Sequence, residues 1–408
     1  MEILCKTFIG RNFEYNMRIV SSLFYLIKQR FAILVIAFFL AIVLFNTTYL
    51  GLGTYVPLFV IFLGLLTFSN AEKTKANKKN IYFIWLSIVI LCSTLLSGGE
   101  QIRDCFKLFI TICFLYYSSS IRVKDSEVRY LSFFICIGYL VYAILVTQAI
   151  GQDTEYYGRA QIRILNSEVA LDPNVVAAVF VLPMIISLYN LLYGKYKLLA
   201  GVILGVFAIS TIALGSRGAT VSFVVSCCLL LLKYFISRTT KMWVKIFSIS
   251  AVVLVSFFVF DFISEQDAIF GFDRILDFTG DDASNGRIGV WIERLNLFTS
   301  SPLYGYGMNY DMGFAHRGMA CHNTFIQILH YGGIIGICLF LIPIASLFKR
   351  ASISKITKMS LFVSVFMPVF FIDTLQERTI WNFLIFYSLL SMRDNAEECL
   401  IWDFEKNK

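Results

Sequence analysis

The chain has 408 residues and a net charge of +8; 58% of its side chains are hydrophobic and only 15% are charged. Soluble globular proteins carry about 25% charged residues, so this composition excludes a chain built from soluble domains. Apolar residues form long runs from end to end, without the alternation that marks an outer-membrane β-barrel. Only helices can then satisfy the backbone hydrogen bonds inside a bilayer, and we predict an all-α integral membrane protein.

Twelve apolar runs are long enough to span a membrane as helices, and we expect them to form a single polytopic domain over 1–408. They are 31–49, 55–69, 81–98, 105–120, 131–150, 174–193, 198–215, 219–235, 245–263, 323–348, 357–372 and 379–392. The basic segment 1–30 lacks a small-residue cleavage site, so no cleavable signal peptide is expected before the first run.

Charge places both termini in the cytoplasm. With this orientation the two terminal segments and the connecting segments on the cytoplasmic side hold 25 of the 35 Lys and Arg but only 10 of the 27 Asp and Glu. This excess of basic residues on the inner side is what the positive-inside rule requires. Most cysteines lie within apolar runs and are expected to behave as small hydrophobic residues.

The basic residues predicted on the outer side are almost all arginines. Besides Lys107 they are Arg103, Arg159, Arg163, Arg217, Arg274, Arg287, Arg294, Arg317 and Arg378. The planar guanidinium fork matches carboxylate and phosphate groups, so this set favours recognition of an anion. Pairing with outer carboxylates is the alternative for each arginine, and for Arg378, beside Glu377, it is the default.

Two long outer loops, 151–173 and 264–322, are expected to carry the function, because long loops in compact bundles are usually functional. In the first, Arg159 and Arg163 would share one face of a helix. Asp172 is expected to cap the following helix, with Pro173 at its first position.

The large loop contains an expected amphipathic helix from Arg287 to Phe298, with Ile288, Trp291, Ile292 and Leu295 on one side. This helix would lie on the membrane or pack over the bundle. Arg287 could contact a ligand or form an ordering salt bridge, and the residues allow both.

Two helix starts complete the set of candidate sites. Ser216-Arg217-Gly218-Ala219 forms a short outer turn where Arg217, at the lipid–water boundary, could bind phosphate or simply cap a helix. His322-Asn323 opens the run at 323–348, and His322 could accept a proton from a sugar hydroxyl or act only as a cap.

No metal-binding pattern stands out, and we predict neither a metal nor a cofactor. Asp277, Asp281 and Asp282 could hold a hard cation, but a solvated acidic loop is the simpler interpretation. The predicted spans hold almost no ionisable residues, which disfavours an ion-coupled transporter. The basic surface faces lipid head groups rather than nucleic acid.

Taken in order, these motifs resemble those of the O-antigen polymerase and ligase superfamily. The resemblance rests on Ser216–Ala219, on Gly286-Arg287 with Trp291, on the run Ser301-Pro302-Leu303-Tyr304-Gly305-Tyr306-Gly307, and on His322-Asn323. It implies a glycosyltransferase of the GT-C type in the bacterial inner membrane, acting at the periplasmic face on glycans linked to undecaprenyl diphosphate.

The resemblance also implies roles for individual residues. Arg217 and Arg163, with Arg159 and Arg287, would hold the donor diphosphate, and His322 would orient or deprotonate the acceptor hydroxyl. Arg378 and Asn323 are further candidate contacts, and a chain-length regulator is an expected partner. Preorganised arginines could stabilise a departing diphosphate without a metal, and a base opposite the diphosphate predicts inversion.

Four activities remain open at this stage. An O-antigen or capsule repeat-unit polymerase fits best, and a ligase that transfers the glycan to lipid A core shares every motif. A flippase for lipid-linked oligosaccharides would be expected to have pseudo-symmetric halves. A peptidoglycan polymerase of the shape-and-division type would use an outer-loop carboxylate, and no such motif stands out.

Overall fold

The computed structural model describes most of the chain after residue 77. The described residues are 78–99, 101–119, 125–149, 172–237, 242–243, 246, 287–308, 321–372, 375, 378–393 and 396–403.

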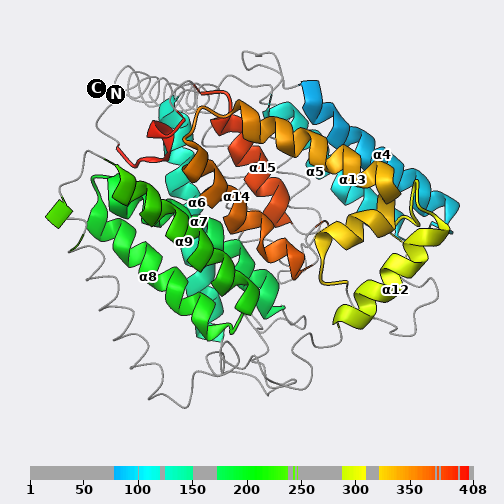
Figure 1. Ribbon diagram of the computed structural model, residues 1–408, viewed down its shortest axis with the longest axis horizontal. Helices are drawn as coiled ribbons and strands as arrows, with labels where there is room; N and C mark the ends of the chain where they lie inside the picture. Colours follow the sequence, from blue (N-terminus) through cyan, green and yellow to red (C-terminus); the bar gives the residue numbers. More distant parts are fainter. Residues whose placement is uncertain are drawn as a thin grey trace, which may run out of the picture.

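All regular elements within these residues are helical (Figure 1). The α-helices are α4 (Ile81–Leu96), α5 (Ile102–Ser118), α6 (Asp125–Ala149), α7 (Pro173–Tyr193), α8 (Lys197–Ala213), α9 (Arg217–Ile236), α12 (Arg287–Ser300), α13 (Thr324–Arg350), α14 (Lys355–Phe366) and α15 (Arg378–Leu390). Three short 3-10 helices are η2 (Lys78–Asn80), η4 (Pro368–Phe370) and η5 (Glu398–Leu400).

Helices occupy nine of the twelve predicted spans, and five helical segments are long and apolar enough to cross a membrane. These five are Lys78–Leu96, Val128–Thr147, Pro173–Tyr193, Arg217–Ile236 and Thr324–Arg350. The predicted spans 31–49 and 55–69 lie outside the described residues, as does 245–263 apart from Ile246. The described part is therefore that of a helical integral membrane protein.

Two helices differ at their ends from the predicted spans. Helix α6 begins at Asp125 rather than at 131, and it includes Arg129, whose buried guanidinium donates to the backbone oxygen of Asp403 (2.5 Å). The predicted span 357–372 is not one helix, because α14 ends at Phe366. Pro368 follows, and proline has no backbone N–H to donate to the next helical hydrogen bond.

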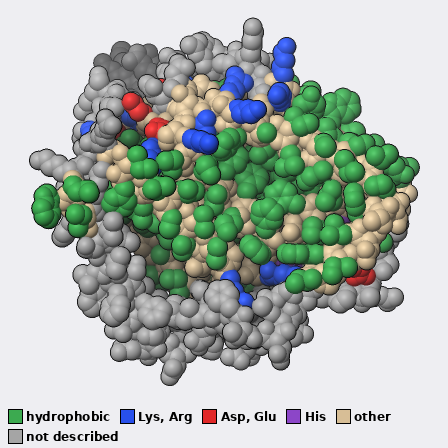
Figure 2. All heavy atoms as spheres, in the orientation of Figure 1, with side chains coloured by type: hydrophobic (Ala, Val, Ile, Leu, Met, Phe, Trp, Pro, Cys, Tyr) green, Lys and Arg blue, Asp and Glu red, His purple; other side chains and the backbone are tan. Residues whose placement is uncertain are grey.

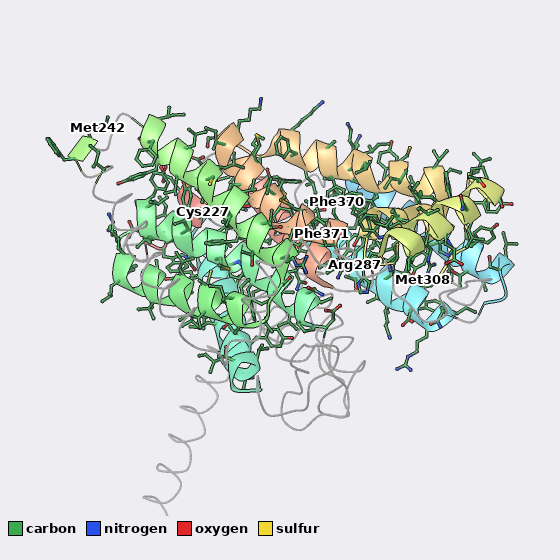
Figure 3. All side chains as sticks on the ribbon, turned by 60° about the horizontal axis from the view of Figure 1, so that its bottom comes forward. Cys227, Met242, Arg287, Met308, Phe370 and Phe371 are labelled. Carbon is green, nitrogen blue, oxygen red and sulfur yellow. The ribbon has the colours of Figure 1, made fainter. Side chains whose placement is uncertain are left out.

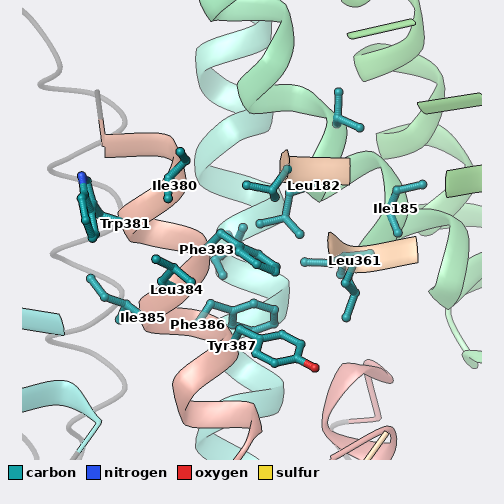
Figure 4. Packing of buried hydrophobic residues seen from close by; sticks show 14 of the residues in the cluster. Leu182, Ile185, Leu361, Ile380, Trp381, Phe383, Leu384, Ile385, Phe386 and Tyr387 are labelled. Carbon is teal, nitrogen blue, oxygen red and sulfur yellow. The ribbon is translucent and has the colours of Figure 1, made fainter. Parts of the chain in front are cut away.

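Helix α15 forms the centre of the core. Its side chains from Ile380 to Leu390 are nearly all inaccessible to solvent, as expected for a helix that is apolar on every side. Figure 4 shows its aromatic residues packed against neighbouring helices. Trp381 meets Phe83 of α4 edge-on at 5.7 Å, and Phe383 meets Phe362 of α14 edge-on at 5.2 Å.

Exposed apolar side chains cover much of one face (Figure 2). Among the described helices, the exposed apolar side chains include Trp85 on α4, Val224 on α9 and Leu341 on α13, which are 52%, 51% and 44% exposed. In this view several Lys and Arg side chains lie along the upper border of this face. An apolar face with a basic border is what a bilayer-spanning surface requires.

The two ends of the bundle differ in character. At one end, called here the Lys233 end, Lys233 Nζ donates to Glu397 Oε1 and Thr357 Oγ1 (both 2.8 Å). Burial disfavours the charged form of Glu397, but hydrogen bonds from Lys233 and Ser354 outweigh it and lower the pKa of Glu397 below its ordinary value. This network joins α9, α14 and the C-terminal segment.

The other end, called the Arg217 end, holds the starts of α9 and α13. Here α13 is broken at Gly333, which has φ 62° and ψ −158°, a conformation essentially restricted to glycine. In an unbroken helix the N–H groups of Ile334 and Ile335 would bond to the oxygens of His330 and Tyr331. Segment 301–308 satisfies all four groups instead.

The four bonds run from Tyr306 N to His330 O (2.7 Å), Gly307 N to Tyr331 O (3.0 Å), Ile334 N to Pro302 O (2.8 Å) and Ile335 N to Leu303 O (3.1 Å). Segment 301–308 is also bound to α4, because Ser93 Oγ donates to Tyr304 O (2.6 Å) and Met308 N donates to Thr94 Oγ1 (2.8 Å). The first part of α13 is thereby fastened to α4.

Candidate functional site

Arg217 is the first residue of α9, directly after the break that separates it from α8. The break is Leu214 to Ser216, and Gly215 takes a positive φ of 61° there. Ser216 is buried, and its oxygen accepts the first helical hydrogen bond from Thr220 (3.0 Å). Arg217 itself is half-buried, and the helix N-terminus adds a favourable field for an anion at this position.

The residue after Arg217 lies against a distant segment. A Cβ atom placed on Gly218 would meet the Phe371 side chain at 3.1 Å. Phe371 follows η4, the 3-10 turn that continues α14. The missing side chain at position 218 therefore lets Phe371 approach the start of α9.

His322 immediately precedes the cap of α13. It is the one described non-glycine residue with a positive φ, at 50°, and such a backbone outlier at a candidate catalytic residue motivates a functional hypothesis. Asn323 caps α13, because its Oδ1 accepts from the N–H groups of Phe325 (3.0 Å) and Ile326 (3.1 Å). The side-chain oxygen of Asn323 thus has a structural role.

The last residue of η4 and the two residues after it connect the two helix starts. The Thr324 hydroxyl donates to the backbone oxygen of Ile372 (2.8 Å), and the Phe325 and Phe370 rings lie 4.6 Å apart. Because Phe371 also contacts Gly218, the three residues 370–372, called here the strap, lie between α9 and α13. Figure 3 labels the two phenylalanines of the strap side by side.

Helix α12 brings the third motif to the start of α13. Trp291 Nε1 donates to the oxygen of Cys321 (2.7 Å), the residue before His322. The face with Val290 and Arg294 is buried, whereas Ile288 is 55% exposed. Ile292 and Leu295 are also exposed, so α12 packs on α13 and leaves its main apolar side uncovered. Arg287 begins the helix and is half-buried.

The structure therefore brings together three of the predicted motifs, those of Arg217, of Arg287 with Trp291, and of His322 with Asn323. Arg159 and Arg163 lie outside the described residues, as do Asp277, Asp281 and Asp282. Arg378 begins α15, and its side chain also lies outside the description. Among the nine outer arginines, Arg294 does not fit the expected role of binding an anion at the surface. Its side chain is buried on the packed face of α12.

Sequence reasoning missed the strap. Phe370 and Phe371 are 46% and 37% exposed, and the sequence places both within the predicted span 357–372. Pro368 was the available signal, because a proline near the end of a predicted span indicates that the helix stops before it.

This end of the protein combines a cation at a helix N-terminus, a strained histidine and exposed aromatic rings. Arginine can bind an anionic leaving group, and histidine can take up a proton near neutral pH. The rings offer an apolar surface beside them. Such an arrangement suits group transfer from an amphiphile with a phosphate head group.

Comparison with known proteins gives an independent result. Residues 200–341 match the family described as O-antigen ligase. This segment contains the Arg217, Arg287, Trp291 and His322 motifs, together with segment 301–308, which bonds to the break in α13. A search of curated proteins finds no match. The family match confirms that this chain resembles the O-antigen polymerase and ligase superfamily, as its motifs had predicted.

Proposed function

We propose that the protein is a surface-polysaccharide polymerase that joins repeat units carried on undecaprenyl diphosphate. The family match supports a polymerase- or ligase-type role in O-antigen biosynthesis. The observation that carries the proposal is the strap, which contacts Gly218 beside Arg217 and Phe325 beside the His322 motif. One donor molecule could therefore contact residues from both motifs.

In this proposal Arg217 binds the diphosphate of the donor, with Arg163, Arg159, Arg287 and Arg378 as further contacts. The bond between the anomeric carbon and the diphosphate oxygen breaks, and its electron pair leaves with undecaprenyl diphosphate. Fixed guanidinium groups stabilise the negative charge that develops there. The arginines supply this stabilisation without a metal ion, so a chelator should leave the rate unchanged.

His322 is the proposed base. The acceptor hydroxyl of the next lipid-linked unit attacks the anomeric carbon from the side opposite the diphosphate, and its proton passes to the imidazole. Attack from that side inverts the anomeric configuration. Asn323 fixes the start of α13 behind His322, and its amide group is a candidate glycan contact.

Placement in the cell follows from the charge asymmetry. We propose a GT-C type enzyme in the bacterial inner membrane, with both termini cytoplasmic and the Arg217 end facing the periplasm. The expected partners are the lipid-linked oligosaccharide, the bilayer and a protein that regulates chain length. A ligase that acts on lipid A core is the second candidate, because the matched family carries that description.

A gel of surface glycan from a deletion strain separates these functions. Loss of the ladder with one repeat unit still attached to lipid A core identifies a polymerase. Loss of all attachment, with polymer accumulating on the carrier lipid, identifies a ligase and would replace our first choice.

Complementation with Arg217→Ala should fail at unchanged protein level. Arg350→Ala provides a matched control, because Arg350 is an exposed arginine at the C-terminal end of α13 and is not one of the outer arginines. Normal long glycans in the Arg217→Ala strain would refute the role assigned to this residue and with it the proposed mechanism.

A further inference from the structure

Phe370 and Phe371 form an exposed aromatic pair between the two motif helices. The side chains are 46% and 37% exposed, although each ring touches a neighbouring helix. Phe370 packs on Phe325 with 4.6 Å between ring centroids, and Phe371 lies where a Cβ on Gly218 would be 3.1 Å away. The pair therefore lies next to Arg217 along one helix and three residues from His322 along another.

The strap that carries the pair is hydrogen-bonded to α13, and so is the nearby Leu375. The Thr324 hydroxyl bonds to Ile372 O at 2.8 Å, and the N–H of Leu375 donates to Gln327 Oε1 at 3.4 Å. Trp381 Nε1 in turn donates to Leu375 O at 2.9 Å. The rings are thus presented from a backbone that is hydrogen-bonded beside the start of α13.

An exposed apolar surface beside the cationic Arg217 matches an amphiphilic ligand with an anionic head. An amphiphile whose anionic head binds Arg217 must begin its hydrocarbon chain within reach of the neighbouring rings. Isoprene units are flat at each double bond and carry methyl branches, so they can stack on aromatic faces. Straight saturated acyl chains lack both features.

We propose that Phe370 and Phe371 bind the isoprene units nearest the diphosphate of a polyprenyl diphosphate. This inference rests on the proposed function and deepens it, because it assigns a place to the lipid portion of the donor. The strap is then a positioning element that holds the first isoprene units on the rings and so fixes the diphosphate relative to His322. Distal isoprene units contribute little to this contact.

Photo-crosslinking tests the contact without requiring catalysis. The full-length protein, with a benzophenone amino acid in place of Phe371, is reconstituted with phosphatidylethanolamine, phosphatidylglycerol and a small fraction of undecaprenyl diphosphate. The control places the same probe at Leu232, which is 51% exposed near the opposite end of α9.

We expect capture of undecaprenyl diphosphate at position 371 to exceed that at position 232 by about fivefold or more. Excess farnesyl diphosphate, which shares the first isoprene units, should compete. Equal capture at the two positions, or adducts with phospholipid alone, would overturn the inference.

Kinetics supply a second readout. The variant Phe370→Ala/Phe371→Ala should raise the KM for the lipid-linked donor about fivefold or more and lower kcat by a smaller factor. The variant Phe370→Leu/Phe371→Leu keeps the apolar volume but removes the aromatic faces, so it should recover only part of the affinity. An unchanged KM in the alanine variant would refute the role of the rings.

These results separate the inference from the function on which it rests. If the wild-type protein binds undecaprenyl diphosphate and Arg217→Ala abolishes binding, but the phenylalanine variants bind normally, only the inference fails. If the wild-type protein does not bind undecaprenyl diphosphate, the proposed function fails, and the inference fails with it.

Discussion

Replacing Gly333 by alanine tests whether the break in α13 is required for the fold. A Cβ at this position would lie 2.4 Å from the carbonyl carbon and oxygen of Leu303. Gly332 is its matched control, because a Cβ there would have its nearest neighbour, a side-chain atom of Ile90, at 3.7 Å. The two variants add the same methyl group at adjacent positions of one helix.

The expected cost of Gly333→Ala has two parts. Holding alanine at a φ of 62° and a ψ of −158° costs about 1–3 kcal/mol. Displacing Leu303 also disrupts the bonds donated by Ile334 and Ile335, each worth about 1 kcal/mol. The total is about 3–5 kcal/mol, a large share of a typical folding free energy of about 5–15 kcal/mol. Gly332→Ala should be neutral, or slightly stabilising through its helix propensity.

The measurement is thermal unfolding of the two variants in detergent, followed by fluorescence-detected size-exclusion chromatography. We expect Gly333→Ala to melt well below the wild type, or to accumulate poorly, while Gly332→Ala behaves like the wild type. Indistinguishable melting of the two variants would show that the bonds between segment 301–308 and α13 do not require a glycine at position 333. Our account of the break would then be wrong.

Three further predictions concern single side chains. His322→Asn should keep the fold, since asparagine tolerates a positive φ, but abolish glycan polymerisation; polymer at wild-type level in a gel assay would remove His322 from the mechanism. Glu397→Gln should lower stability by about 1–2 kcal/mol at neutral pH. Because the pKa of Glu397 is lowered in the folded protein, this difference should vanish as the pH falls through the acidic range below about 4; a difference that stays constant with pH would contradict the assignment. Trp291→Phe removes the hydrogen bond to Cys321 and should reduce polymerisation more than it lowers the melting temperature, whereas Ile292→Ala, at an exposed position, should affect polymerisation less.

The helices themselves could be predicted from the sequence because their signals are local. A run of apolar residues indicates a span wherever it lies, and nine such runs coincide with described helices. The cap of α7 is equally local, and it is confirmed, since the N–H of Asn174 donates to Asp172 Oδ1 at 2.8 Å. The amphipathic helix α12 was likewise predicted from its own residues.

The arrangement of the site could not be predicted, because it depends on contacts between segments that are distant in sequence. Gly218 and Phe371 each fit several interpretations alone, and only the fold places them in contact. Gly305 and Gly307 belong to a motif that was recognised, but glycine is needed at 305, 307 and 333 because another backbone segment approaches closely, and no local pattern shows that approach. The start of α6 also differs from the predicted span, because Arg129 has its hydrogen-bond partner in the C-terminal segment.

Segment 301–308 determines which helix His322 is connected to. It fixes the first part of α13, and with it His322, to α4. Arg217 belongs to a different group, because α9 packs along α14 and is bonded to it through Ser226 and Ser360 (2.8 Å). The site thus lies where two packed pairs of helices meet, α4 with α13 and α9 with α14, and the strap contacts a helix of each pair at this end.

A donor bound across this boundary would draw the two pairs together. We expect spin labels on α9 and α13 to change their separation when donor is added, while labels on α9 and α14 keep theirs. Equal changes in both distances would contradict this division.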